Sequence, residues 1–132
     1  MTDEIDTAED ATDSEVTRYE KAYRETRRVL DESIETLMIL KEFETDTDRR
    51  DEIAAEEFDL KTERSSLVRA NIAFHTGKAT MVPPPAALVA EIVKLSKQAV
   101  ELTVERATAA AVLKLATSAL NKFAEIQKLE DV

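Results

Sequence analysis

An apolar stripe in the C-terminal third of the chain constrains the fold more than any other feature. It recurs at alternating four- and three-residue spacing from position 88 to position 127, and ten of its twelve positions are apolar. Side chains at this spacing share one face of an α-helix, because the helix turns once every ~3.6 residues. Such a face must be covered by the rest of the chain or by another copy. The positions are Leu88, Ile92, Leu95, Ala99, Leu102, Arg106, Ala109, Leu113, Ala116, Leu120, Phe123 and Gln127.

The remaining sequence also favours an all-α fold. The 132 residues include one Gly and three Pro, far fewer turn residues than a sheet protein of this length needs. Apolar periodicity predicts helices over about 15–44, 48–75 and 86–129. Because the connections between them are short, we expect an antiparallel helical bundle, formed by a single domain over residues 16–132.

The last predicted helix is longer than its neighbours. Its 44 residues span roughly 66 Å, against about 40 Å for each of the other two. Either it stays whole, which gives three helices, or it breaks near residues 102–111, which gives four. Thr103, Val104 and Thr108 are weaker helix formers and favour a break. The uninterrupted 4-3 register favours a continuous helix, and we prefer that alternative.

The negative charge is concentrated at the N-terminus. Residues 1–15 hold seven of the 28 acidic residues and no Lys or Arg, so the other 117 residues carry a formal charge of only −3, from 21 acids and 18 bases. Ile5 is their only large aliphatic residue. This segment has too little apolar surface to offset the entropy of ordering, so we predict a disordered acidic tail.

The second predicted helix has clear boundaries but an irregular stripe. Four residues with N-cap side chains, 45–48, precede it, and Gly77 follows it as the expected left-handed cap residue. Lys61 and Arg64 interrupt its apolar positions. We therefore expect this helix to be the most loosely packed of the set.

Composition excludes several functional classes. Without Cys the chain has no disulfide, thiolate metal site or cysteine nucleophile. A balanced body and an acidic tail give no electrostatic basis for binding nucleic acid or an anionic membrane. No signal-peptide pattern and no long apolar run is present, so we expect a cytoplasmic protein, with signal-less export left open.

No residue pattern indicates catalysis. His75 is the only His, and its neighbours in sequence offer no catalytic partner. A carboxylate site with Glu56, Glu57 and Arg64 is conceivable, but a solvent-facing helix surface explains the same residues. The spacing of Asp46, Asp48 and Glu57 resembles a calcium loop, yet Arg50 and Asp51 occupy positions that need a ligand and a Gly. We expect neither an enzyme nor a metal or other cofactor.

The function that the pattern favours is protein–protein interaction. We expect a helical module that self-associates, with a homodimer as one form, or docks a partner helix through the 88–127 stripe. The alternative is an acidic inhibitor- or chaperone-like protein that binds a basic partner. The sequence specifies neither the partner nor the pathway. The candidate interface residues are Leu102, Leu113, Leu120, Phe123, Leu37 and Leu40.

Overall fold

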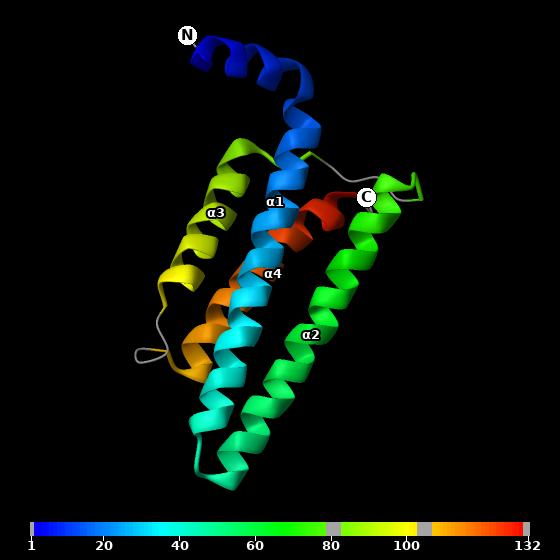
Figure 1. Ribbon diagram of the computed structural model, residues 1–132. Coiled ribbons are helices and arrows are strands. Elements are labelled where there is room, and N and C mark those ends of the chain that lie inside the picture. Colours follow the sequence, from blue (N-terminus) through cyan, green and yellow to red (C-terminus); the bar gives the residue numbers. More distant parts are fainter. Residues whose placement is uncertain (1, 79–82, 103–106, 131–132) are drawn as a thin grey trace.

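The computed structural model describes residues 2–78, 83–102 and 107–130, with side chains for 17–78, 83–102 and 107–126. Within these ranges the chain is all-helical and has no strand. It forms four helices, shown in Figure 1: α1 (Thr2–Phe43), α2 (Thr47–His75), α3 (Ala86–Glu101) and α4 (Ala109–Glu130).

The preferred continuous last helix is wrong, because the chain breaks within the range named as the alternative. Leu102 is extended, with φ −76° and ψ 104°, and ends α3. Thr108 caps α4: its hydroxyl accepts a hydrogen bond from the Ala111 amide at 3.1 Å, and its carbonyl accepts one from Val112 at 3.0 Å. The break folds the stripe back on itself, so that α3 and α4 pack together. The stripe has two polar positions, Arg106 and Gln127. Arg106 and the side chain of Gln127 both lie outside the described residues.

Helix α1 is the centre of the fold. It packs against α2, α3 and α4, whereas α2 and α3 do not touch each other in the described part of the chain. Figure 1 shows α2 and α3 on opposite sides of α1, with α4 behind it. Helix α2 touches α4 only slightly, so the edge between α2 and α4 is the open edge of the assembly.

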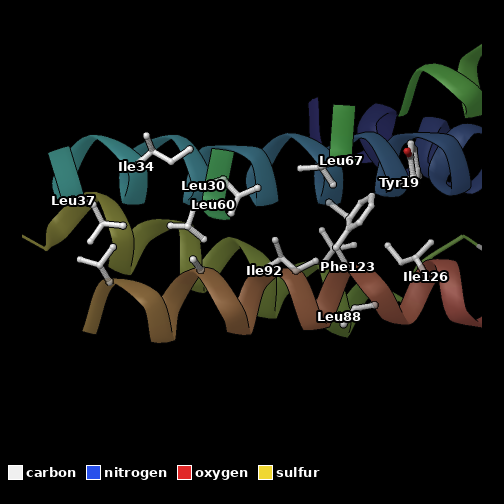
Figure 2. Close-up of a cluster of buried hydrophobic side chains, with 14 of the residues drawn as sticks. Tyr19, Leu30, Ile34, Leu37, Leu60, Leu67, Leu88, Ile92, Phe123 and Ile126 are labelled. Carbon is white, nitrogen blue, oxygen red and sulfur yellow. The ribbon is translucent and has the colours of Figure 1, made fainter. Parts of the chain in front are cut away.

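The apolar core lies among all four helices (Figure 2), and α2 contributes Ile53, Leu60 and Leu67 to it. Leu30 and Leu37 of α1 and Ile92 of α3 are fully buried, and Ile126 of α4 is nearly so. Small residues let the helices approach closely: Ala22, Ala116 and Ala119 have no exposed surface. The chain therefore covers much of its own stripe.

The ends of α2 follow from local side-chain chemistry. Asp46 is its N-cap, and the carboxylate accepts a hydrogen bond from the Asp48 amide at 3.2 Å. At the other end Gly77 has φ +75°, which confirms the predicted left-handed cap residue. The Lys78 amide then donates to the Ala73 carbonyl at 2.8 Å, closing the helix in the way such caps do.

The N-terminal boundary differs from the prediction. Helix α1 begins at Thr2 rather than near residue 15, so the structure does not show the predicted disordered tail. In Figure 1 these first turns project beyond the start of α3. That residues 16–132 form one domain stays a prediction.

Candidate functional site

The six candidate interface residues fall into two groups. Leu37 and Phe123 are 0% and 2% exposed and point into the core in Figure 2. The other four are half-buried and pack against the edge of that core: Leu40, Leu102, Leu113 and Leu120. That any of the six contacts a partner stays a prediction. The four half-buried leucines have exposed apolar surface that a partner could contact.

Three of the half-buried leucines line the open edge between α2 and α4, which we call the α2–α4 seam. The seam contains two hollows. The larger, of about 500 Å³, is lined by Leu40, Glu44, Arg49, Glu52, Ile53, Glu56, Ala107, Thr108, Ala109, Ala110 and Leu113. The smaller, of about 240 Å³, is lined by Glu63, Ser66, Leu67, Leu120, Asn121, Phe123 and Ala124. Each hollow therefore has an apolar floor between two helices.

The wall that α2 contributes to the seam is acidic. Glu52, Glu56 and Glu63 lie along it at intervals that keep them on one side of the helix. Among the charged residues that the structure describes in the lining of the two hollows, Glu44 adds a further acid and Arg49 is the one base. The seam thus combines an apolar floor with a net negative rim.

Glu56 is the most perturbed side chain of this rim. Its Oε2 atom is buried and has no hydrogen-bond partner within the described residues. Burial raises the pKa of Glu56, and the neighbouring carboxylates of Glu52 and Asp59 raise it further. A buried acceptor without a donor costs free energy, which a cation or N–H group placed in the hollow would recover.

Glu57, the next residue, points toward α1 rather than into the seam and has a different environment. It is buried against α1, and its two carboxylate oxygens each accept a charged hydrogen bond at 2.7 Å, one from Lys41 and one from Lys61. The bonds from Lys41 and then Lys61 lower the pKa of Glu57 despite its burial. This carboxylate holds α2 on α1.

The residues of the hypothetical carboxylate site do not share a site. Glu56 faces the seam, Glu57 pairs with two lysines, and Arg64 donates to Asp31 of α1 at 2.8 Å. His75 is exposed in the last turn of α2. In the described residues, no group of three or more acidic, His or Cys side chains is arranged to hold a metal ion.

Sequence reasoning missed the seam because it placed the interface on one long helix. The signal was present, however, in the run of acids from Glu56 to Glu63, which we interpreted only as a solvent-facing surface.

None of the described helices has both the length and the apolar character needed to cross a membrane. Comparison with protein-family models, curated proteins and solved structures finds no match to this chain. Function is therefore inferred from the geometry alone.

Proposed function

We propose that this protein is a non-enzymatic helical interaction module that binds a basic amphipathic helix of a partner protein in the α2–α4 seam. One observation carries the proposal: the seam offers an apolar floor under a negatively charged rim at the one edge where two neighbouring helices barely meet. A partner helix with apolar residues on one face and Lys or Arg beside them matches both features.

The floor supplies the affinity in this proposal. Leu40, Leu113 and Leu120 are already half-buried, so a docked helix removes their remaining apolar surface from water. In this proposal the interface involves only the second half of the stripe, which contains the candidate residues Leu113, Leu120 and Phe123. Docking there leaves Leu37 and Phe123 in the core.

The rim supplies orientation and specificity. Glu52 and Glu63 are exposed and form no ion pair within the described ranges, so a cation on the partner helix can pair with them. The buried Oε2 atom of Glu56 gains a donor when a Lys or Arg enters the larger hollow. Charged rims act mainly on association rate and partner choice, so we expect them to select basic helices over acidic ones.

A synthetic peptide tests the seam directly. The probe is a helical peptide of leucine and lysine whose leucines share one face, and its control is a scrambled peptide of the same composition. We expect the full-length protein to bind the amphipathic peptide, measured by fluorescence anisotropy, and not the scrambled one. Absence of binding up to about 1 mM would contradict the proposal, because that corresponds to only about −4 kcal/mol.

A charge-reversal variant locates the binding. Glu52→Lys with Glu63→Lys should weaken peptide binding about tenfold or more, since like charges then face each other across the rim. The matched control is Glu35→Lys with Glu101→Lys, which makes the same change in net charge at exposed positions of α1 and α3. Equal losses in both variants would indicate a general charge effect rather than binding in the seam.

Salt separates this proposal from the alternative of an acidic inhibitor- or chaperone-like protein acting through its N-terminal segment. Charge-driven binding is strongly screened at ~0.5 M salt, where the Debye length falls to a few Å. Binding to an apolar floor persists under that condition. Loss of all peptide binding at high salt would favour the alternative.

A further inference from the structure

The two hollows of the α2–α4 seam lie at matching positions along its two walls. The larger hollow joins the first turns of α2, at residues 49–56, to the start of α4, at residues 107–113. The smaller hollow joins residues 63–67 of α2 to residues 120–124 of α4. The two helices therefore run in the same direction along the seam, as Figure 1 also shows.

The step from the larger hollow to the smaller is seven residues on both walls. On α4 it leads from Leu113 to Leu120, and on α2 it leads from Glu56 to Glu63. Seven residues make nearly two helical turns, so the members of each pair lie on almost the same face, about 10.5 Å apart along the axis. Each hollow thus offers one half-buried leucine and one glutamate, repeated at the same interval.

The floors of the two hollows follow the same repeat. The buried apolar residues of α2 recur every seven residues, at Ile53, Leu60 and Leu67. Ile53 lines the larger hollow together with Leu40, and Leu67 lines the smaller one together with Phe123. A seven-residue repeat on neighbouring helices is the pattern of a coiled coil, in which a side chain of one helix fits between four side chains of the next.

The contact between α2 and α4 does not complete this pattern. The two helices barely meet, and Leu113 and Leu120 remain half-buried between them. In the larger hollow the buried Oε2 atom of Glu56 has no hydrogen-bond donor within the described residues. A third helix that follows the same repeat fits both features, because it brings apolar side chains to the leucines and a cation to the carboxylate.

We propose that the seam selects its partner by a seven-residue repeat. The partner is a basic helix with a large apolar residue at every seventh position, which we call an anchor, and with a Lys or Arg beside each anchor. One anchor enters each hollow next to Leu113 or Leu120, and the adjacent cation pairs with Glu56 or Glu63. This inference rests on the proposed function and adds a spacing to it, since a basic amphipathic helix can carry its apolar residues at other intervals.

An eleven-residue interval provides the comparison that isolates the spacing. Residues eleven positions apart also share one face of a helix, but they are about 16.5 Å apart along the axis. A helix with anchors at this interval places only one of them in a hollow at a time, because the hollows are about 10.5 Å apart. Its charge and its amphipathic character are otherwise the same.

The first experiment measures the binding of two such peptides to the full-length chain by fluorescence anisotropy. The peptides have the same composition of leucine, lysine, glutamine and alanine, and their leucines are seven residues apart in one and eleven in the other. We expect the seven-residue peptide to bind about tenfold or more tightly, because it buries a second anchor. Equal affinities would overturn this inference and leave the proposed function standing. Binding of neither peptide would also overturn it, and the leucine–lysine peptide described above then decides the proposed function separately.

Filling each hollow in turn identifies the two binding points. Ala110 and Ala124 are exposed and line the larger and the smaller hollow, respectively. Ala110→Trp and Ala124→Trp should each abolish the preference for the seven-residue peptide, because one anchor can then no longer enter its hollow. The matched control is Ala87→Trp, at an exposed position of α3 outside both hollows, and it should keep the preference.

Circular dichroism verifies that the three variants keep their helices and that the two peptides are equally helical. With folded variants, a preference that survives both fillings would overturn the proposal. Loss of the preference in Ala87→Trp would also overturn it, because the spacing would then be read outside the seam.

Discussion

Helices α2 and α3 both pack on α1, but they are held there by different chemistry. Helix α3 buries five of its 16 residues, four of them apolar. Helix α2 buries four of its 29, and one of these is Glu57. This confirms the expectation that α2 packs most loosely. It also shows that one helix can hold two partners, α3 through apolar contact and α2 through apolar contact with added polar side-chain pairs.

Three polar side-chain contacts, in the described residues, join α2 to α1 along most of its length. Glu57 bonds Lys41, Arg64 bonds Asp31, and Asn71 accepts a hydrogen bond from the Tyr19 hydroxyl at 3.0 Å. Such contacts fix orientation but contribute little net free energy, because the groups regain water when they separate. The comparison therefore identifies α2 as the helix with the sparser burial, and the seam as the loosely packed edge beside it.

The two sides also differ in charge. The α2–α4 seam has an acidic rim, whereas the hollow between α1 and α3 has four described cations in its lining, Arg18, Lys21, Lys94 and Lys97. Apolar residues line both.

Core truncation on each side gives the largest expected effect. Ile92→Ala on α3 should lower the free energy of unfolding by about 4 kcal/mol, and Leu67→Ala on α2 by about 2 kcal/mol, because a loosely packed site relaxes around the lost volume. Ile92 has no exposed surface and Leu67 is 5% exposed, so burial alone predicts a smaller difference. Urea unfolding measures both. Equal losses of unfolding free energy in the two variants would contradict the conclusion that α2 is packed more loosely than α3.

Removing the buried charge of α2 should have the next largest effect. Glu57→Gln is expected to lower the free energy of unfolding by about 1–2 kcal/mol at pH 7. This is less than the loss for a fully buried ion pair, because both lysine partners are about one-third or more exposed. Bonds from Lys41 and Lys61 lower the pKa of Glu57 in the folded chain. Its stabilisation is therefore full above the unfolded pKa of about 4.3 and is lost as the pH falls through the folded pKa.

The measurement for Glu57 is a series of urea titrations from neutral to acid pH. The wild-type and Glu57→Gln curves should converge at low pH, where the carboxyl is protonated in both states of the wild type. Glu35→Gln, at an exposed position of α1, is the control. A constant difference across the whole pH range would show that Glu57 acts through packing rather than charge.

The hydrogen bond between α1 and α2 should have a smaller effect. Asn71→Ala removes the acceptor of the buried Tyr19 hydroxyl and should cost about 1 kcal/mol. Burial, followed by the nearby charges of Tyr23 and Glu20, raises the pKa of Tyr19 to about 12. In Tyr23→Phe the only remaining tyrosine is Tyr19, so its absorbance titration should have a midpoint clearly above 10, because burial, the largest cause of the raised pKa, remains while the charge of Tyr23 is removed. A midpoint close to 10 would mean that α2 does not cover Tyr19.

The smallest expected effect is a gain in stability. Burial and the adjacent carboxylates raise the pKa of Glu56, so its ionised form destabilises the fold above the folded pKa, and this cost is relieved as the pH falls. Glu56→Gln should therefore raise the free energy of unfolding at pH 7 by about 0.5 kcal/mol. Thermal melts at pH 7 and pH 4 provide the measurement. A loss at pH 7 would show that the carboxylate already has a stabilising partner.

The sequence by itself determined the helical class and most helix ends. Alternating apolar spacing and the lack of turn residues permit few other folds, because only a helix gathers residues at that spacing on one face. Local chemistry determined the end of α2, since Gly77 adopts the left-handed conformation that side chains disfavour. These features depend on neighbours in sequence, which is why they could be predicted from it.

The break at Leu102 and the central place of α1 were decided by tertiary packing. The same spacing is compatible with one long helix or two short ones, and only the burial of α3 and α4 against α1 favours folding back. The acids of α2 were visible in the sequence, but the α2–α4 seam could not be predicted as one surface, because it combines residues from helices far apart in sequence. Which side chains share a surface depends on which helices become neighbours, and periodicity carries no information about that choice.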